Sequence, residues 1–91
     1  MGITWAASAD RHGISHEDAL YAITNAQGSV EIEDDDPDSV TTVYVGHPHA
    51  QTDRYIEVIV AARPPRTLVV FHVMELSDLF RHLVKREGER P

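Results

Sequence analysis

Four short runs between residues 29 and 73 predict β-strands, because the first and third alternate apolar with polar residues and the second is rich in β-branched residues. In the third run Ile56, Val58 and Val60 fall on one face, and Glu57 falls on the other. The fourth run is apolar on both faces, which predicts a central strand. The connections between the runs are short and favour an antiparallel meander. The four predicted strands are residues 29–33, 40–46, 55–61 and 67–73.

Helical patterns flank the predicted strands on both sides. Ser15 is a suitable N-cap for a helix that ends near Gly28, and an acidic residue three positions on fits a capping box. Before this helix, residues 6–11 predict one or two helical turns that end at Gly13. Residues 77–86 predict a C-terminal amphipathic helix. Its apolar stripe consists of Leu76, Leu79, Phe80, Leu83 and Val84.

These elements predict one α+β domain over residues 1–91, in which short helices pack on a twisted antiparallel sheet of about four strands. A C-terminal amphipathic helix follows the sheet, residues 3–5 form a short extended start, and residues 86–91 form a frayed tail. The first residues lack the basic and apolar regions of a signal peptide. No apolar run approaches the roughly 20 residues that span a bilayer, so no membrane contact is expected.

Charge is unevenly distributed along the chain. Its 15 acidic and 8 basic residues give a formal net charge of −7, which argues against a broad electrostatic contact with nucleic acid. The ordinary interpretation of the acidic run is a solvated loop; a docking surface for a basic partner and a weak divalent-ion site are the alternatives. This run consists of Glu31, Glu33, Asp34, Asp35, Asp36 and Asp38. The absence of cysteine excludes disulfides and thiolate zinc sites, and it suits the reducing cytoplasm.

Six histidines supply candidate proton donors and acceptors. His12 comes just before a predicted helix N-terminus, His72 lies on the predicted central strand, and His47 follows the second strand. Small ribonucleases that use no metal need a proton shuttle near neutral pH and a cation for the phosphate charge. The candidate catalytic residues are therefore His12, His72 and His47, and the candidate phosphate-binding residues are Arg54, Arg63 and Arg66.

Structural interpretations remain open beside these assignments. His72 alternates with Leu68 and Val70, which also fits a half-buried, hydrogen-bonded ring, and the arginines also fit exposed positions at strand ends. His47 and His49 place two rings on one side of an extended segment, a pattern too weak to predict a zinc site. The sequence has no H-E-x-x-H, EF-hand, P-loop or G-x-G-x-x-G motif, so we expect no metal and no cofactor.

The segment Arg11-His12-Gly13-Ile14-Ser15-His16-Glu17-Asp18-Ala19 resembles the K-H-G-V-S-F-E-E-A segment of the BrnT family, the ribonuclease toxins of type II toxin–antitoxin systems. The order of predicted elements is also similar over residues 3–73, and residues 43–46 resemble the family's R-x-x-x-I-G strand. The resemblance implies a RelE-like fold and places His12 at the position of the motif histidine. Arg11 takes the place of the family's lysine and joins the candidate phosphate-binding residues.

The resemblance is weaker toward the end of the chain. The family's basic Ile-Ser-Ala-Arg-like strand corresponds here to residues 69–76, where His72 would stand in for the missing cation. Glu75 in the same segment would oppose an RNA phosphate. The net charge of −7 also differs from that of a basic RNA-cleaving toxin.

The leading hypothesis is a cytoplasmic, metal-independent endoribonuclease toxin. A histidine would deprotonate the RNA 2′-hydroxyl, and an arginine would hold the phosphate. Its partners would be the RNA substrate and a cognate antitoxin protein, with the toxin present as a homodimer or in a toxin–antitoxin heterotetramer. The alternative hypothesis is a non-catalytic protein-binding module, or a dimeric partner protein, that uses the acidic loop.

Overall fold

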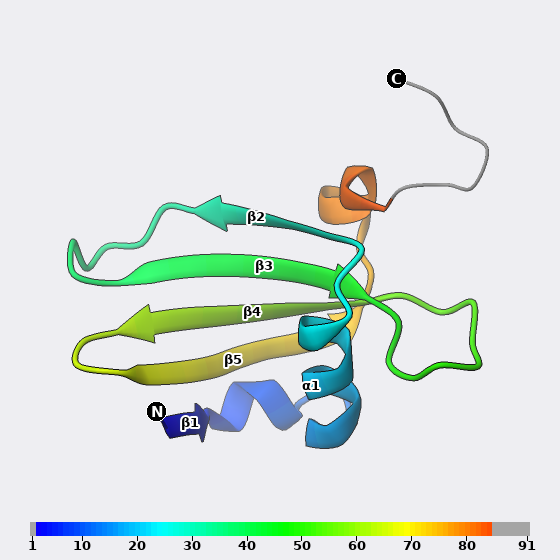
Figure 1. The fold of residues 1–91 in the computed structure, drawn as a ribbon, viewed down its shortest axis with the longest axis horizontal. Coiled ribbons are helices and arrows are strands. Elements are labelled where there is room, and N and C mark those ends of the chain that lie inside the picture. Colours follow the sequence, from blue (N-terminus) through cyan, green and yellow to red (C-terminus); the bar gives the residue numbers. More distant parts are fainter. Residues whose placement is uncertain (1, 85–91) are drawn as a thin grey trace.

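The computed structural model describes residues 2–84, and the chain forms an α+β fold with a five-stranded mixed sheet (Figure 1). Its single α-helix, α1, and two short 3-10 helices, η1 and η2, flank the sheet within the described residues. In chain order the elements are β1 Gly2–Trp5, η1 Ala7–Asp10, α1 His16–Thr24, β2 Gly28–Ile32, β3 Val40–Gly46, β4 Ile56–Arg63, β5 Thr67–Glu75 and η2 Asp78–Leu83.

The sheet has the spatial order β1-β5-β4-β3-β2. Strands β2 to β5 form the expected antiparallel meander. The expectation of about four strands in a purely antiparallel sheet is wrong, because β1 adds a fifth strand parallel to β5. The residues expected as a short extended start pair with β5, with Ile3 opposite Leu68 and Trp5 opposite Val70. This pairing covers part of the backbone edge of β5, which would otherwise carry unsatisfied N–H and C=O groups.

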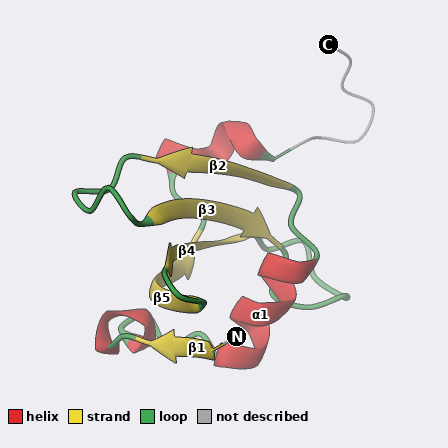
Figure 2. Cartoon of the chain, turned by 60° about the vertical axis from the view of Figure 1, so that its left-hand side comes forward, coloured by secondary structure: helices red, strands yellow, loops and turns green. Residues whose placement is uncertain are grey.

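Helix α1 covers one face of the sheet, and we call this face the helical face (Figure 2). Ala19 and Ala22 of α1 are fully buried there. They pack in one core cluster with Ile56, Val58 and Val60, the strand face that the alternation in the sequence predicts. The small alanine side chains allow the helix to approach the strands closely. The helix, which has nine residues, covers only one end of the sheet (Figure 1).

Local signals fix the start and the end of α1. The Ser15 side chain accepts a hydrogen bond from the Asp18 amide at 3.1 Å, which confirms Ser15 as the N-cap. Asn25 is the C-cap, and its side-chain amide donates to the Tyr21 carbonyl at 3.1 Å. The helix therefore ends at Thr24, four residues before Gly28, which is already the first residue of β2.

The C-terminal helix differs from the expectation. Leu76 donates its amide to the Tyr55 carbonyl and so prolongs the pairing of the β4 and β5 ends. Six residues then form the 3-10 helix η2, which has no side-chain N-cap and lies against β2. Leu79, assigned to the apolar stripe, is 72% exposed, so the stripe is not buried as a continuous surface. The last residues of the predicted helix and the predicted tail, residues 85–91, lie outside the described part of the chain.

The helices described between residues 2 and 84 include none that is both long and apolar enough to cross a membrane.

The close approach of α1 to β3 predicts a steric limit at Gly46. A Cβ atom at this position would lie 2.8 Å from the Ala22 carbonyl oxygen and 3.3 Å from the Ala26 Cα. Because helix backbone cannot yield as a flexible side chain does, we expect Gly46→Ala to lower the free energy of unfolding by about 1–3 kcal/mol in urea denaturation. Gly2→Ala is the control, since nothing lies within 4 Å of its Cβ. Equal stability of the two variants would contradict the packing described here.

Candidate functional site

The pairing of β4 with β5 contains a β-bulge. Ile59 pairs with His72 and Val60 pairs with Val70, which leaves Phe71 as an extra residue in β5. The extra residue reverses the alternation of side chains beyond it, so Val73 joins Val70 in the core cluster under α1. The expectation that His72 shares a face with Leu68 and Val70 is therefore wrong. His72 lies on the opposite face of the sheet, which we call the histidine face.

Glu57 of β4 lies on this same face, two residues from Ile59, the register partner of His72. Its side chain is only 3% exposed, and both carboxylate oxygens accept a hydrogen bond. His72 Nε2 donates to Oε2 at 2.8 Å, and the Ser77 amide donates to Oε1 at 2.7 Å. A buried carboxylate is costly unless it is hydrogen-bonded in this way. The arrangement fixes the orientation of the His72 ring and leaves Nδ1 as the nitrogen that can accept a proton.

The bulge also positions the turn that carries His12. The Ser8 hydroxyl donates to the carbonyl oxygen of Phe71 at 2.6 Å, and the Ala6 amide donates to the carbonyl of Val70 at 2.9 Å. These bonds hold η1 along the edge of β5, just beyond β1 (Figure 1). The chain then turns at Gly13, whose φ of +71° is a conformation that favours glycine.

A second set of contacts holds the far side of the same turn. The His16 ring stacks on Trp5 with the ring centroids 3.8 Å apart and an interplanar angle of 4°. Its Nε2 also lies 2.7 Å from Asp10 Oδ1. Through these contacts the first residue of α1 is tied to β1 and to η1. The segment between Asp10 and His16 is therefore anchored at both ends, and His12 lies within it.

His12 and His72, which we call the histidine pair, meet at this point. Their ring centroids are 6.3 Å apart, and the rings are inclined at 70°. His12 is exposed, whereas the side chain of His72 is 29% exposed. Two imidazoles that reach solvent beside each other, one of them held by a buried carboxylate, can donate and accept protons in one reaction. Arg11 directly precedes His12 in the chain, and it is therefore the predicted phosphate-binding residue that lies next to the pair in the sequence.

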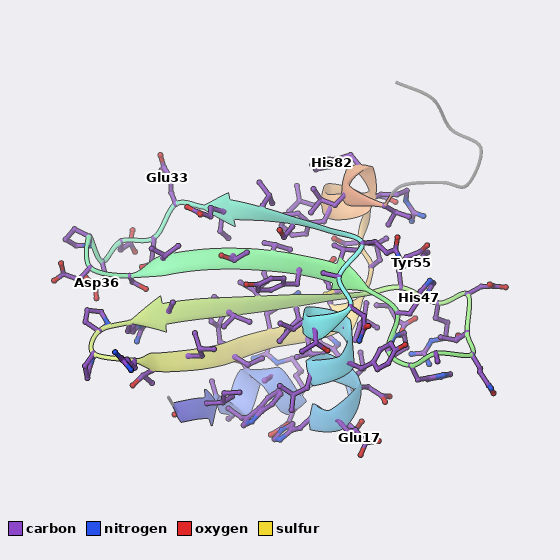
Figure 3. The ribbon with its side chains drawn as sticks, viewed as in Figure 1. Glu17, Glu33, Asp36, His47, Tyr55 and His82 are labelled. Carbon is purple, nitrogen blue, oxygen red and sulfur yellow. The ribbon has the colours of Figure 1, made fainter. Side chains whose placement is uncertain are left out.

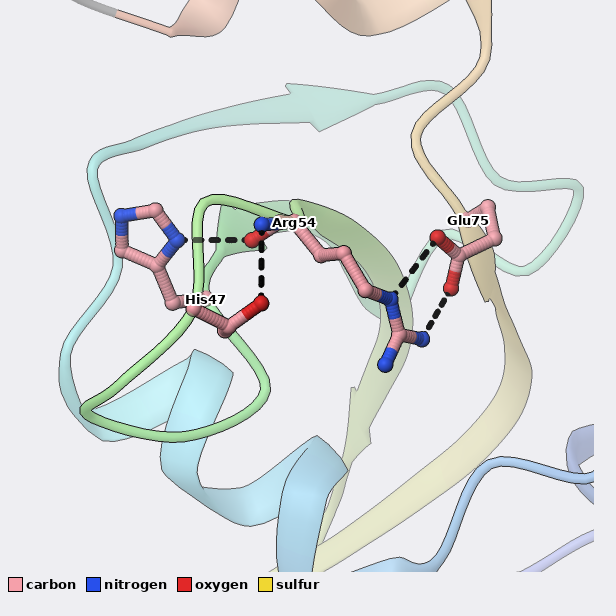
Figure 4. A network of polar contacts seen from close by, with 4 residues as sticks. His47, Arg54 and Glu75 are labelled. Atoms are coloured by element: carbon pink, nitrogen blue, oxygen red, sulfur yellow. Dashed lines mark hydrogen bonds and ion pairs between the residues drawn. The ribbon is translucent and has the colours of Figure 1, made fainter.

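His47 lies in a different environment, at the end of β3. Its Nδ1 donates to the Arg54 carbonyl oxygen at 2.6 Å (Figure 4). Its ring centroid also lies 4.2 Å from that of Tyr55. These contacts close the connection between β3 and β4. The structure thus gives His47 a structural role in this loop and does not bring it to the histidine pair.

Arg54 is engaged by a carboxylate on the helical face. Its guanidinium donates two hydrogen bonds to Glu75, which pairs with Ile56 at the end of β5 (Figure 4). The hydrogen bonds with Glu75 raise the pKa of Arg54 above its ordinary value and, reciprocally, lower the pKa of Glu75. Glu75 and His72 are on opposite faces, so the acidic residue expected to oppose an RNA phosphate lies away from the histidine pair.

Arg63 and Arg66 lie at the other end of the β4–β5 hairpin. Arg63 is four residues from Ile59, the partner of His72, which corresponds to roughly 13 Å along the strand. The Arg63 side chain borders the same surface hollow as Asp34, Asp35 and Phe71. Both arginines are exposed, and the hairpin directs them toward the acidic loop.

The acidic loop between β2 and β3 is ordered by its own carboxylates. Asp34 accepts hydrogen bonds from the Asp36 amide and the Thr41 hydroxyl, and Asp36 accepts one from the Asp38 amide. The loop lies at the opposite end of the sheet from His47 and Tyr55 (Figure 3). Residues 2–84 contain no group of three or more histidine or carboxylate side chains arranged to hold a metal ion. In this loop the carboxylates of Asp34 and Asp36 thus stabilise turns by accepting hydrogen bonds from backbone amides.

Glu57 is the site residue that sequence reasoning missed. The alternation placed it on the face opposite Ile56 and Val58 but assigned it neither a partner nor a role. The usable signal was a single charged residue inside the otherwise apolar run 56–62. Such a residue in a central strand is buried only if it has partners, and here the partners come from β5 and from the residue before η2.

Comparison with known proteins adds no assignment to this geometry. The chain matches no protein-family model, and searches of curated proteins and of solved structures found no match. The resemblance to the BrnT family therefore stays a prediction, and the function proposed below is argued from the residues and their arrangement.

The hydrogen bonds in the acidic loop predict a stability change at low pH. The Asp36 amide and the Thr41 hydroxyl lower the pKa of Asp34 from 3.8 to about 2. Because the pKa is lower in the folded chain than in the unfolded chain, Asp34 stabilises the fold above pH 3.8, and this contribution disappears as the pH falls through 2. We expect Asp34→Asn to be less stable than the wild type at pH 6 and to approach it near pH 2 in urea titrations.

Asp35→Asn is the matched control, because it removes the same charge from an exposed neighbour in the same loop. If both variants lose the same stability at pH 6, general charge repulsion and not the Asp34 hydrogen bonds governs the acid response.

Proposed function

We propose that the protein is a metal-independent endoribonuclease, the toxin of a type II toxin–antitoxin pair, and that the histidine pair is its acid–base apparatus. The observation that carries the proposal is the meeting of His12 and His72 from distant parts of the chain, with His72 held by the buried carboxylate of Glu57. The BrnT-like motif around His12 supports the same assignment. In this proposal the protein acts on RNA in the cytoplasm and is inhibited by a cognate antitoxin.

The two rings have different roles in the proposed reaction. His72 accepts the proton of the RNA 2′-hydroxyl at Nδ1, and the negative charge of Glu57 stabilises the imidazolium that forms. The 2′-oxygen attacks phosphorus, and the bond from phosphorus to the 5′-oxygen breaks. His12 donates a proton to the departing 5′-oxygen. The products are a 2′,3′-cyclic phosphate and a 5′-hydroxyl, so the transfer requires neither a metal nor a further reactant.

Phosphate binding in this proposal begins with Arg11. It is exposed beside His12, and its planar guanidinium matches two phosphate oxygens. Arg54 is less suited to this step in the described arrangement because Glu75 occupies its guanidinium. Arg63 and Arg66 would contact a more distant part of a bound RNA strand, beyond the hairpin end of β4 and β5.

The first test is cleavage of single-stranded RNA in the presence of EDTA. We expect the wild type to release fragments with a 2′,3′-cyclic phosphate, and His12→Ala and His72→Ala each to reduce the rate by roughly 10²–10⁴-fold, the contribution of one acid or base. His82→Ala is the control, since His82 is exposed on η2 (Figure 3). Cleavage that persists in the variant lacking both His12 and His72 would refute the proposed site.

The second test addresses the role of Glu57. Glu57→Gln retains the size of the side chain but removes the charge that stabilises the imidazolium, so we expect a smaller loss of cleavage rate than in His72→Ala. The loss should appear in kcat and not in KM, because Glu57 acts through the His72 ring. An unchanged kcat in Glu57→Gln, with a lower free energy of unfolding, would show that Glu57 serves only the stability of the strand pair.

A second candidate function is a protein-binding module, and one observation favours it. An apolar groove lies on the helical face, away from the histidine pair. The two functions are compatible because the groove and the histidine pair lie on opposite faces of the sheet.

A further inference from the structure

The histidine pair has a second chemical capacity besides acid–base chemistry. An imidazole nitrogen that carries no proton is also a ligand for divalent transition metals. His72 presents such a nitrogen, Nδ1, because its Nε2 donates to Glu57 at 2.8 Å. His12 adds a second ring, whose centroid lies 6.3 Å from that of His72. Both rings reach solvent, since His12 is exposed and the side chain of His72 is 29% exposed.

Glu57 gives His72 the support that metal-binding histidines usually have. In such sites the ring nitrogen that does not hold the metal donates its proton to a carboxylate, which fixes the ring and makes the other nitrogen a stronger ligand. Here the carboxylate is 3% exposed, and its second oxygen accepts the Ser77 amide at 2.7 Å. Because both oxygens of Glu57 are engaged, this residue orients the ring and is not itself a ligand.

The separation of the two rings suits one metal ion between them. A zinc ion lies about 2 Å from each histidine nitrogen, so two rings that share it have centroids roughly 5–6.5 Å apart, depending on the angle at the metal. The observed 6.3 Å lies near the upper end of this range. A tetrahedral angle requires the rings to approach by about 1 Å. His12, exposed in the turn before α1, is the ring that can make this movement.

The charges and ligands around the pair favour a transition metal over other cations. Glu57 and Asp10 bring two carboxylates close to the rings, against one arginine, Arg11, beside His12 in the sequence. Residues 2–84 contain no group of three such ligands, so water would complete the coordination, as it does at open zinc sites. Two imidazoles suit zinc or copper, whereas Mg²⁺ prefers oxygen ligands.

We propose that the histidine pair binds Zn²⁺ through Nδ1 of His72 and one ring nitrogen of His12, and that the bound ion inhibits RNA cleavage. While the ion is bound, His72 cannot accept the proton of the 2′-hydroxyl, and His12 cannot carry the proton for the departing oxygen. The inhibition rests on the ribonuclease function proposed above, whereas the binding of the ion does not. EDTA, which stops nucleases that require a metal, would keep this protein active.

The binding experiment is isothermal titration calorimetry of the full chain with zinc chloride, without RNA or chelator. We expect His12→Ala and His72→Ala each to weaken zinc binding at least tenfold, and magnesium chloride to give no binding heat. Glu57→Gln should weaken zinc binding roughly tenfold or more, the usual effect of losing the carboxylate behind a metal-binding histidine. His82→Ala is the control, since it removes an exposed histidine of η2 outside the pair.

Urea denaturation supplies a second measurement on the same proteins. A ligand that binds only the folded chain raises its stability, so zinc should raise the urea midpoint of the wild type and of His82→Ala but not that of His12→Ala. His12 is exposed in a turn, so His12→Ala leaves the buried Glu57 and its partners in place. This variant therefore tests the site even if Glu57→Gln fails to fold.

The inhibition experiment measures RNA cleavage at increasing zinc concentration. We expect cleavage by the wild type and by His82→Ala to fall over the range in which calorimetry detects binding, and to return when EDTA is added. If the wild type does not cleave RNA in EDTA, the ribonuclease proposal fails, and calorimetry still decides whether the zinc site exists.

Three results would overturn the proposal. Absence of zinc binding by the wild type would remove the site. Equal affinity in the wild type, His12→Ala and His72→Ala would place the ion elsewhere on the chain. Full cleavage activity at a zinc concentration that saturates the site would show that the bound ion does not inhibit.

Discussion

The extra residue in β5 determines how this chain places its reactive side chains. Without it, His72 would point into the core beneath α1, and Val73 would lie on the opposite face. The bulge is stabilised from outside the strand pair, because Ser8 donates to the Phe71 carbonyl. The same hydrogen bond positions η1 and, after it, His12. One local irregularity in the sheet therefore supplies one ring of the histidine pair and orders the segment that carries the other.

Glu57 links the position of His72 to the rest of the fold. A carboxylate buried to this degree is strongly disfavoured unless its oxygens are hydrogen-bonded, and here the partners are a ring on β5 and the amide of Ser77. Loss of either partner would leave a buried charge partly unsatisfied. The fold thus favours one orientation of the His72 ring, and proton transfer depends on that orientation. Stability and the proposed chemistry depend on the same two hydrogen bonds.

Features that depend on neighbouring residues were predictable from the sequence. The bounds of the second predicted strand, the N-cap at Ser15 and the turn at Gly13 follow from short-range patterns, and all three are present. The parallel pairing of β1 depends on a partner strand more than 50 residues away along the chain. The bulge at Phe71 depends on the register between β4 and β5, which alternation does not encode. The same limit applies to the site: His12 and His72 were predicted individually, but Glu57 was not. Arg54 was assigned to phosphate, whereas the structure pairs it with Glu75.

The distribution of charge is compatible with RNA at the histidine pair despite the net charge of −7. His72 is two strands away from β3, and its register partner there, Val43, is three residues from the start of that strand. These steps correspond to roughly 10 Å across the sheet and roughly 10 Å along it, and so the start of β3 lies beyond the Debye length of about 8 Å at physiological salt. Nearer to the site, the hollow that Phe71 lines contains Arg63 together with Asp34 and Asp35. Glu75, the acidic residue nearest to His72 in the sequence, lies on the other face and is paired with Arg54. The carboxylates nearest to the histidine pair are thus engaged, Glu57 by His72 and Asp10 by His16, and Arg63 faces the carboxylates of the acidic loop.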